Sequence, residues 1–408
     1  MDKLIKAIAA ALDMVEGELL GATTHHGKRV AVLASAMGKH LGMEDELLLP
    51  LTTCALLHDN ALTEYIQSER MGEAQYQMMR LHCEYGQRNV DSLMFKTSVS
   101  GFVLYHHEQP DGGGPFGKRE GEIPLEAELI GVADSFDVVH HLEQVRPEEL
   151  PRLHEELWDG MGKKYTRRSV TAMLRVLDEN MLRSLGNDRI RETGESYIPA
   201  WFIDLEDQVI LNLADFVTRI IDDKSVFTQR HTTQIANKAW LLGGYYGYEP
   251  GLRARFYLAA VLHDIGKLAI PTAILEKPGR LNDEEFEIIK SHVSITWDLL
   301  EEIDGFEDIR RWAADHHEKL DGSGYPLGKK GEALDFNSRL LACIDIYQAV
   351  SEDRPYHPAR GHKDTMKILE YMADEGKLDR DIVRDMDKVL AEWSGRDVPS
   401  PANRVLGY

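Results

Sequence analysis

The chain has 408 residues, of which 43% are hydrophobic, so it is long and apolar enough for about two or three globular domains. A formal net charge of −22, with no cluster of Lys and Arg, excludes a protein that holds DNA or RNA polymers by their phosphate backbone. No stretch approaches the roughly 18 uncharged apolar residues of a membrane span, so we expect no membrane partner.

The first half begins with a predicted helix over residues 1–20, where apolar side chains recur at helical steps. Further on, an adjacent His-Asp pair ends the apolar run LLHD (56–59), and a pair of histidines opens the segment HHEQPDGGGPFG (106–117). Single histidines and one aspartate stand around these motifs. The candidate metal ligands of this half are His26, His58, Asp59, His82, His106, His107 and Asp134.

Helical patterning lapses near 193–199, which predicts a linker between a domain at 1–192 and a domain at 200–408. In the second half, predicted helices cover 229–242, 256–266, 284–303, 339–350 and 364–376, and the alternation expected of strands is scarce. We therefore predict an all-α fold of two tandem helical bundles. The candidate metal ligands of the second half are His231, His263, Asp264, His292, His316, His317 and Asp345.

The two halves repeat one another. His26 and His231 are 205 positions apart, and so are His58 and His263, whereas the later histidine pairs are 210 apart. Constant separations that change once describe a duplication with one short insertion, which falls after the second His-Asp pair. It falls where the second half has the extra loop LAIPTAILEKPGRLNDEEF (268–286).

The type and number of the candidate ligands indicate their chemistry. Five imidazoles and two carboxylates in each half are too many for one tetrahedral structural zinc, and no set of thiolates accompanies them. They suit two octahedral-tending cations bridged by a carboxylate, as in dinuclear hydrolytic sites.

The second half resembles an HD-GYP domain of the HD superfamily of metal-dependent phosphohydrolases. The resemblance rests on HTTQIA (231–236), HDIGK (263–267), His292, HHEKLDGSGYP (316–326), Asp345 and SEDRPY (351–356). The first half is similar to a degenerate repeat of the same kind. A lone His-Asp pair would be a weak signal, but these motifs at this spacing are specific.

The resemblance implies two divalent cations, iron or manganese, in the second half, with Asp264 bridging them. His231, His263 and Asp345 would complete one coordination sphere, and His292, His316 and His317 the other. Some family members hold a third cation through a glutamate four residues before the first histidine. Phe227 occupies that position here, so we expect two cations, with two more possible in the first half.

The family's reaction is phosphodiester hydrolysis by a hydroxide that two cations activate. Asp264 and Lys267 would be catalytic, the lysine by pairing with a phosphate oxygen, although a lysine that favours the end of a helix is the structural alternative. The candidate substrate contacts are Lys267, Lys277, Arg280, Gly324, Tyr325 and Arg354. For Lys277 and Arg280, and for the DGSGYP loop, an ordinary surface loop or turn is an equal alternative.

The first half keeps every candidate ligand but not the surrounding motifs. Leu62 stands where the second half has Lys267, the GYP segment is replaced by GPF (114–116), and VRPE (145–148) faces DRPY. Three interpretations stay open for this half: a ligand sensor or dimer organiser without turnover, a second hydrolase with another substrate, or a structural remnant.

The resemblance implies an enzyme that hydrolyses cyclic di-GMP to pGpG and GMP. The alternatives are a phosphodiesterase specific for 3′,3′-cGAMP and a non-catalytic cyclic-dinucleotide receptor. A homodimer or a signalling protein is a possible further partner. Three scattered cysteines, Cys54, Cys83 and Cys343, predict reduced buried thiols and a cytoplasmic location.

Overall fold

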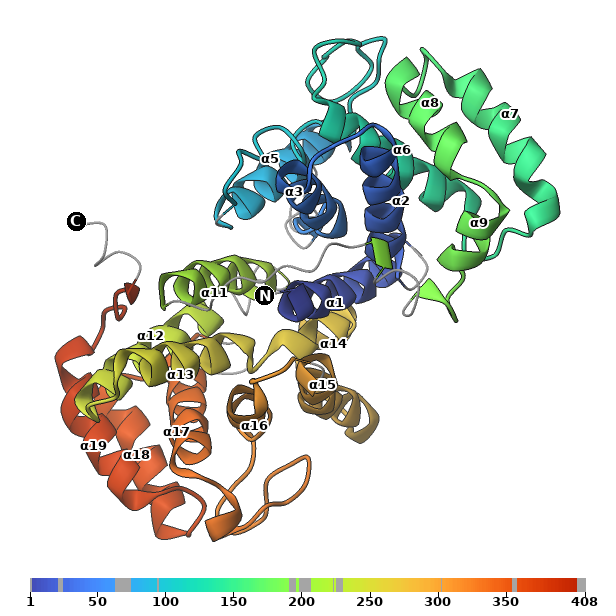
Figure 1. The fold of residues 1–408 in the computed structure, drawn as a ribbon. Helices are drawn as coiled ribbons and strands as arrows, with labels where there is room; N and C mark the ends of the chain where they lie inside the picture. Colours follow the sequence, from blue (N-terminus) through green and yellow to red (C-terminus); the bar gives the residue numbers. More distant parts are fainter. Residues whose placement is uncertain are drawn as a thin grey trace. The chain divides into compact units, whose positions relative to one another are not determined.

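The chain divides into two compact units, Met1–Ile203 and Asp204–Tyr408, which we call the N-terminal and C-terminal units. The computed structural model describes residues 2–20, 25–62, 75–93, 95–190, 196–197, 207–222, 224, 230–301, 303–353 and 358–401. In Figure 1 the N-terminal unit runs from blue to green and the C-terminal unit from yellow to red. The division lies beyond the linker expected at 193–199, and the boundaries of functional domains stay a prediction.

The N-terminal unit is built from helices joined by turns. Its α-helices are α1 (Asp2–Leu20), α2 (His26–His40), α3 (Asp45–Leu56), α5 (Gln75–Asp91), α6 (Leu125–His140), α7 (Leu150–Gly160), α8 (Arg167–Val176) and α9 (Glu179–Leu185), with a 3₁₀ turn η1 (Pro147–Glu149) before α7.

The C-terminal unit follows a similar order of elements. Its α-helices are α11 (Asp207–Asp222), α12 (His231–Tyr245), α13 (Pro250–Leu262), α14 (Thr272–Leu275), α15 (Asp283–Glu301), α16 (Glu307–Ala314), α17 (Phe336–Ser351), α18 (His362–Asp374) and α19 (Arg380–Leu390). The 3₁₀ turns are η2 (Ile265–Ala269), η3 (Gly331–Ala333) and η4 (Ala391–Trp393).

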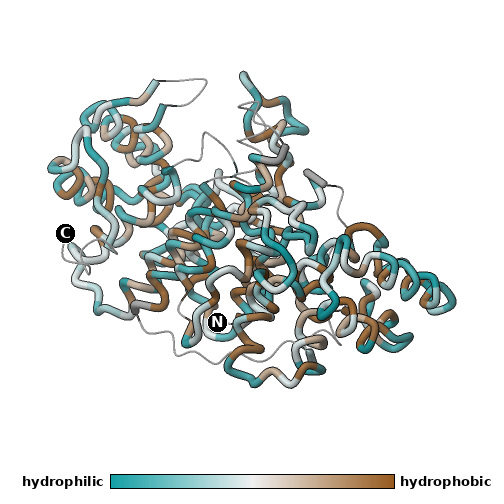
Figure 2. The backbone as a smooth tube through the Cα atoms, turned by 90° about the horizontal axis from the view of Figure 1, so that it is seen from above, coloured by the Kyte–Doolittle hydropathy of each residue, from teal (hydrophilic) through white to brown (hydrophobic). Residues whose placement is uncertain are grey.

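The predicted all-α fold is confirmed. In the part of the chain that the structure describes, extended pairing is limited to isolated bridges such as Asp111 with Arg119 and Asp321 with Lys330. In Figure 2 hydrophobic (brown) and hydrophilic (teal) segments alternate along many of the helices. This alternation is expected of helices that bury one face and expose the other. Some helices are buried more uniformly: in α13 every residue from Phe256 to Leu262 is buried, and in α2 every residue from Arg29 to Gly38.

The same helix pairs form the centre of each unit. In the N-terminal unit α2 packs on α3 and α6, and in the C-terminal unit α12 packs on α13 and α17. The inner faces of these helices are apolar, with fully buried residues such as Leu33 and Ile130 in one unit and Ile235 and Leu341 in the other. This shared packing brings together the helix ends that carry the candidate ligands.

The first ligand helix of each unit begins in the same unusual way. His25 and Arg230, the residues before α2 and α12, have φ angles of 68° and 71°, in the left-handed region that non-glycine residues seldom adopt. Aspartates of the preceding helix hold the first turn: Asp13 accepts the N–H of Gly27 at 3.1 Å, and Asp222 accepts the N–H of Thr232 at 3.0 Å. The first histidine of each set therefore stands at a fixed helix start.

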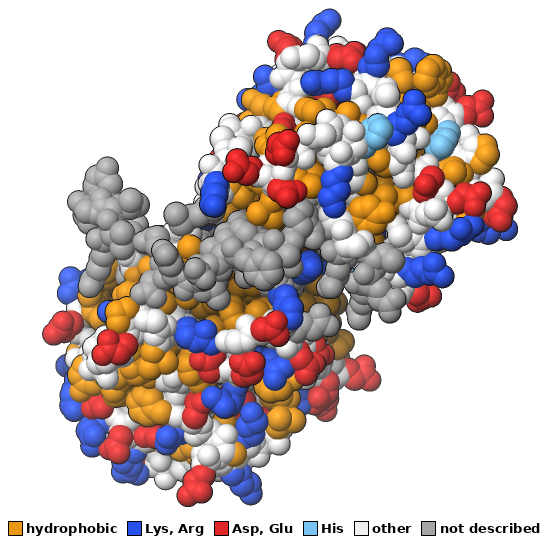
Figure 3. All heavy atoms as spheres, viewed as in Figure 1, with side chains coloured by type: hydrophobic (Ala, Val, Ile, Leu, Met, Phe, Trp, Pro, Cys, Tyr) orange, Lys and Arg blue, Asp and Glu red, His pale blue; other side chains and the backbone are white. Residues whose placement is uncertain are grey.

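The surface carries mixed charge. Figure 3 shows Lys and Arg side chains interspersed with Asp and Glu side chains over the visible face of each unit. Within the described residues we find no helix with the length and hydropathy that a membrane span would need.

Candidate metal centres

In the C-terminal unit, Asp264 lies at the centre of the predicted ligand set. Its Oδ2 is 3.1 Å from Nε2 of His263 and 3.8 Å from Nε2 of His231. Its Oδ1 is 3.4 Å from Nε2 of His292 and 3.8 Å from Nε2 of His316. Each carboxylate oxygen thus faces its own pair of imidazoles, which is the arrangement of a carboxylate that bridges two cations.

Asp345, on α17, completes the set. Its Oδ1 lies 3.5 Å from Nε2 of His231, and its Oδ2 lies 3.6 Å from Nδ1 of His317. All seven predicted ligands of this half therefore meet in one place, although they come from α12, the end of α13, α15, the turn after α16, and α17.

Hydrogen bonds of the rings fix which nitrogen faces the centre. Three imidazoles donate their Nδ1 hydrogen to the backbone carbonyl three residues earlier, which leaves the Nε2 lone pair for a cation. These rings are His263 on Ala260, His292 on Ile289, and His316 on Ala313. His231 instead donates its Nδ1 hydrogen to the carboxylate of Glu352, at 2.8 Å.

Unsatisfied atoms at the centre test whether a cation fits. Nε2 of His263 and Oδ1 of Asp264 are buried without a hydrogen-bond partner among the described residues. Buried polar atoms are rarely left in this state, because the desolvation cost is not recovered. Imidazole nitrogens and carboxylate oxygens are ligands that iron, manganese and zinc accept. The residues therefore fit divalent cations.

Burial shapes the protonation of the ligands. It lowers the pKa of His292 to about 3 and that of His317 to about 4, so both rings are neutral and able to coordinate. Burial also opposes the charged form of His231, but hydrogen bonds to Asp345 and Glu352 raise its pKa to about 9. A cation at Nε2 of His231 must therefore displace a proton.

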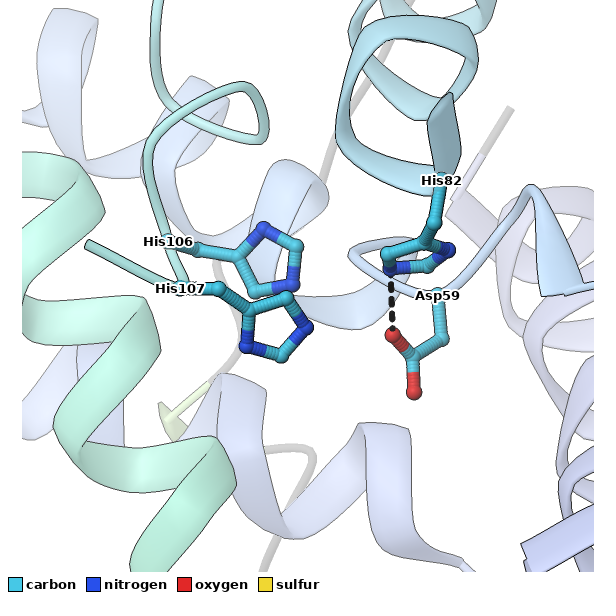
Figure 4. A group of neighbouring side chains, drawn as sticks. All are labelled: Asp59, His82, His106 and His107. Atoms are coloured by element: carbon cyan, nitrogen blue, oxygen red, sulfur yellow. Dashed lines mark ion pairs between the residues drawn. The ribbon is translucent and has the colours of Figure 1, made fainter. Parts of the chain in front are cut away.

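The N-terminal unit repeats this geometry. Asp59 presents Oδ2 to Nε2 of His58 at 3.5 Å and Oδ1 to Nε2 of His82 at 3.2 Å. Asp134 lies with Oδ1 3.3 Å from Nε2 of His26 and with Oδ2 3.8 Å from Nδ1 of His107. In Figure 4 the His82 ring lies next to the Asp59 carboxylate, and His106 and His107 lie together facing this pair.

Two groups of candidate ligands share Asp59. In one group Asp59 is with His26 and His58, and in the other it is with His82, His106 and His107. The ligand atoms of each group lie within 4.8 Å of one another. The seven predicted ligands of the first half are thus brought together as well, with the aspartate placed to bridge two cations.

Supporting contacts in the N-terminal unit are similar but incomplete. His58 and His106 donate Nδ1 hydrogens to the carbonyls of Ala55 and Val103. His26 donates to Asp137 at 2.7 Å. In contrast to His292, its counterpart His82 has both ring nitrogens buried without a hydrogen-bond partner in the described chain. Its ring is held less firmly than that of His292.

Lys267 marks the sharpest difference between the centres. Its ammonium lies 2.5 Å from Oδ2 of Asp264, and the side chain is 18% exposed, so it borders both the bridging carboxylate and solvent. Leu62, at the corresponding position, is buried and has no charge. The N-terminal unit therefore lacks a cation from the protein at this place.

The loop after the paired histidines has one backbone form in both units. A Cβ at Gly324 would lie 2.5 Å from the backbone of 317–319, and a Cβ at Gly114 would lie 2.5 Å from Cα of Glu108, so both positions require glycine. Glu318 accepts the N–H groups of Leu327 and Lys329, and Glu108 accepts those of Phe116 and Lys118. These glutamates fix the loop.

The predicted substrate contacts have different surroundings. The Tyr325 ring lies against the His317 ring, with centroids 4.7 Å apart, beside the metal centre. Lys277 forms an ion pair with Glu285 at 2.5 Å, so its charge is already engaged. Arg280 is exposed. Arg354 lies outside the described residues, as does Phe227, on which the expectation of two rather than three cations rests.

Several supporting residues escaped the sequence analysis. Glu352 and Asp137, which orient the first histidine of each set, were not predicted, nor were Glu318 and Glu108. A signal existed for Asp137, because it stands one helical turn after Asp134 on α6. Glu318 and Glu108 directly follow the paired histidines in both halves, which a comparison of the repeats could have used.

Comparisons with known proteins agree with this geometry. A family model described as HD domain matches residues 13–163 and 215–382. The chain is 28% identical to 3′3′-cGAMP-specific phosphodiesterase 1 of Vibrio cholerae over 92% of this chain and 88% of that protein. It is 29% identical to 3′3′-cGAMP-specific phosphodiesterase 3 of the same organism over 72% of this chain and 64% of that protein.

Other relatives match shorter parts. A cyclic di-GMP phosphodiesterase of Thermotoga maritima is 32% identical over 46% of this chain and 50% of its own length. The crystal structure of a cyclic GMP-AMP specific phosphodiesterase of V. cholerae superimposes with a TM-score of 0.66 at 22% identity, covering 96% of this chain and 97% of that one, and supports the fold. The prediction of a metal-dependent phosphodiesterase is confirmed at the level of enzyme class. The chain belongs to the HD domain family of metal-dependent phosphohydrolases.

Proposed function

We propose that this chain hydrolyses 3′,3′-cGAMP at the centre around Asp264 in the C-terminal unit. The observation that carries the proposal is the Asp264 carboxylate, with a separate imidazole pair at each oxygen and the Lys267 ammonium beside it. The relatives that match most of the chain are named for this substrate. The sequence alone favoured cyclic di-GMP, and the relatives support the hybrid dinucleotide better.

Bound divalent cations would supply an activated water and neutralise charge on a phosphodiester. The protein's own residues prepare for this role. His263, His292 and His316 point Nε2 inward because their Nδ1 hydrogens are bound to backbone carbonyls. Lys267 adds a fixed positive charge, which becomes more favourable as negative charge develops on the phosphoryl oxygens.

The surroundings of the centre suit a nucleotide. Tyr325 places an aromatic face against His317, next to the candidate ligands, where a base can stack. Phe286 lies edge-on to Tyr325, with ring centroids 6.4 Å apart. Base selection would depend on such contacts, whereas the phosphodiester chemistry depends on the ligand set. Cyclic di-GMP is therefore the second candidate substrate, supported by the relative from T. maritima.

A receptor without turnover is the remaining alternative for the chain. The complete ligand set and the ammonium of Lys267 beside the bridging carboxylate disfavour it, since binding alone requires neither. For the N-terminal unit, the three interpretations of the sequence stay proposals. Its own ligand set supports cation binding, so we propose about four cations in a fully loaded chain, iron or manganese.

The test is product analysis with the full chain reconstituted with Mn(II) or Fe(II). We expect 3′,3′-cGAMP to be linearised fastest and cyclic di-GMP more slowly, with no product after chelation. Asp264→Asn should reduce the rate at least ~10²-fold, as loss of a key electrostatic group does. Asp59→Asn is the matched control and should retain hydrolysis while losing about two cations per chain.

Each outcome bears on the proposal. Faster hydrolysis of cyclic di-GMP than of the hybrid would reverse the substrate assignment. Tight binding of both dinucleotides without any product would favour the receptor. Loss of hydrolysis in Asp59→Asn but not in Asp264→Asn would move the reaction to the N-terminal unit.

A further inference from the structure

The N-terminal unit contains a cavity of about 320 Å³ beside its candidate metal centre. His106 and His107 form one wall, one face of α6 forms another, and the turn between α7 and α8 closes the third. His107 is partly exposed, so the cavity reaches the ligand set. Small-molecule sites begin at about this volume, which suits a mononucleotide better than an intact cyclic dinucleotide.

The charges that line this cavity favour an anion. Two glutamates contribute to the wall, but both are engaged: Glu108 accepts two backbone N–H groups, and Glu128 forms an ion pair with Arg168 at 2.7 Å. Lys164 lines the cavity as well, and no carboxylate of the described residues forms an ion pair with it. With cations at the histidines, the cavity would present positive charge from two sides.

Hydroxyl groups also line this cavity. Tyr165 and Ser135 line the cavity, and the Ser135 hydroxyl donates to the backbone carbonyl of Gly131 at 2.6 Å. Burial raises the pKa of Tyr165, so its hydroxyl keeps its hydrogen at neutral pH. Hydroxyl groups can hydrogen-bond to the hydroxyls of a sugar or to phosphate oxygens.

The C-terminal unit does not share these groups. Thr166 caps α8, and Asp379 caps the corresponding helix α19. The residue before the cap is Tyr165 in the N-terminal unit and Leu378 in the C-terminal unit. Ser135 directly follows Asp134, and the residue after Asp345 is Ile346. Two apolar side chains thus replace the two hydroxyls. The polar wall is specific to the unit that lost the counterpart of Lys267.

We propose that the N-terminal unit binds a nucleoside monophosphate in this cavity, with its phosphate between Lys164 and the metal centre and with Tyr165 and Ser135 as hydroxyl contacts. The nucleotide part of this assignment rests on the proposed function, because opening a cyclic dinucleotide yields ligands with a terminal phosphate monoester. The phosphate part rests on the cavity itself.

The test is equilibrium binding of GMP, AMP and inorganic phosphate to the metal-loaded full chain that carries Asp264→Asn, which removes turnover at the other centre. We expect GMP or AMP to bind more tightly than phosphate. Lys164→Met and Tyr165→Leu should each weaken nucleotide binding about tenfold, in line with the loss of one charged contact or one hydroxyl contact at a binding site. Lys163→Met, a change at an exposed neighbour outside the cavity, is the matched control.

Several results would overturn the proposal. Unchanged affinity in Lys164→Met and in Tyr165→Leu would exclude the cavity, and equal binding of phosphate and nucleotides would exclude the nucleoside contact. Tyr165→Phe removes only the hydroxyl group and guards against a folding defect in Tyr165→Leu. Hydrolysis of cyclic dinucleotides by the unaltered chain is measured separately. Nucleotide binding without hydrolysis would contradict the proposed function alone, and hydrolysis without nucleotide binding would contradict this inference alone.

Discussion

The two units hold the same ligand types in nearly the same geometry, yet they differ around them. Both have an aspartate whose two oxygens face different imidazoles. Lys267 borders this aspartate in one unit, whereas a buried leucine, Leu62, does so in the other. Backbone hydrogen bonds and helix packing hold the ligand set in place. The set can therefore be retained even where a side chain needed for the reaction, such as Lys267, has been replaced.

The largest effect is expected when Lys267 of the C-terminal centre is replaced by leucine, the residue found at the corresponding position of the N-terminal unit. Lys267→Leu should lower kcat/KM about 10²-fold, because the ammonium near Asp264 no longer stabilises charge on the phosphoryl oxygens. Metal content should stay the same, since lysine is not a candidate ligand. Steady-state kinetics together with metal analysis make the measurement.

A drop in both metal content and rate would assign Lys267 to the support of Asp264 rather than to the substrate. Full activity in Lys267→Leu would show that the difference between the units at this position has no bearing on catalysis.

The paired loops offer a second comparison. Gly324→Ala would place a Cβ 2.5 Å from backbone atoms of residues 317–319, so the loop that carries Tyr325 must shift. We expect about a tenfold loss of kcat/KM, the order of effect of a displaced positioning group. Gly114→Ala meets a similar clash in the N-terminal unit. The two variants should lower the melting temperature by similar amounts, but Gly114→Ala should not cause a comparable loss of hydrolysis.

Equal losses of hydrolysis in the two glycine variants would contradict the assignment of turnover to the C-terminal unit. A normal rate and melting temperature in Gly324→Ala would mean that the loop accommodates a side chain.

The smallest expected effect concerns the aspartates that hold the first ligand helices. Burial raises the pKa of Asp222 from 3.8 to about 6. The folded protein therefore takes up a proton near pH 6 that the unfolded chain does not take up until about pH 4. This group stabilises the fold by about 1.4 kcal/mol as the pH falls from 7.5 to 5.

In Asp222→Asn that contribution disappears. The gain in melting temperature of the metal-free chain between pH 7.5 and pH 5 should be smaller than in the unaltered protein, as measured by calorimetry. Burial also raises the pKa of Asp13, so Asp13→Asn is the counterpart in the other unit. An identical pH response in the unaltered chain and in both variants would show that neither carboxylate titrates in this range.

The ligand sets and the helical fold could be predicted from the sequence because they depend on residue type and spacing. His263 and Asp264 are adjacent, and the recurrence of the same residues in the other half made the pattern specific. The enzyme class followed from the same motifs. The substrate did not, since base selection depends on side chains that no spacing rule places.

The sequence did not allow us to predict which charged side chains form ion pairs with one another. Lys277 was a candidate for the substrate, but in the fold it lies against Glu285, eight residues further along the chain. Glu352, which directly follows α17, reaches His231 although the two are 121 positions apart. The cavity beside His107 could not be foreseen, because it depends on how the turn before α8 packs against α6.

The helix starts at His26 and His231 have a consequence for anyone who divides this protein into separately expressed halves. Arg230 adopts a backbone conformation that costs about 1 kcal/mol or more for a residue with a side chain, and Asp222 pins the turn that follows it. A fragment that began at the HTTQIA motif would lack the Asp222 carboxylate that accepts the N–H of Thr232, so the first turn with His231 would lose this support. The second half therefore needs all of α11 to keep its first histidine in place.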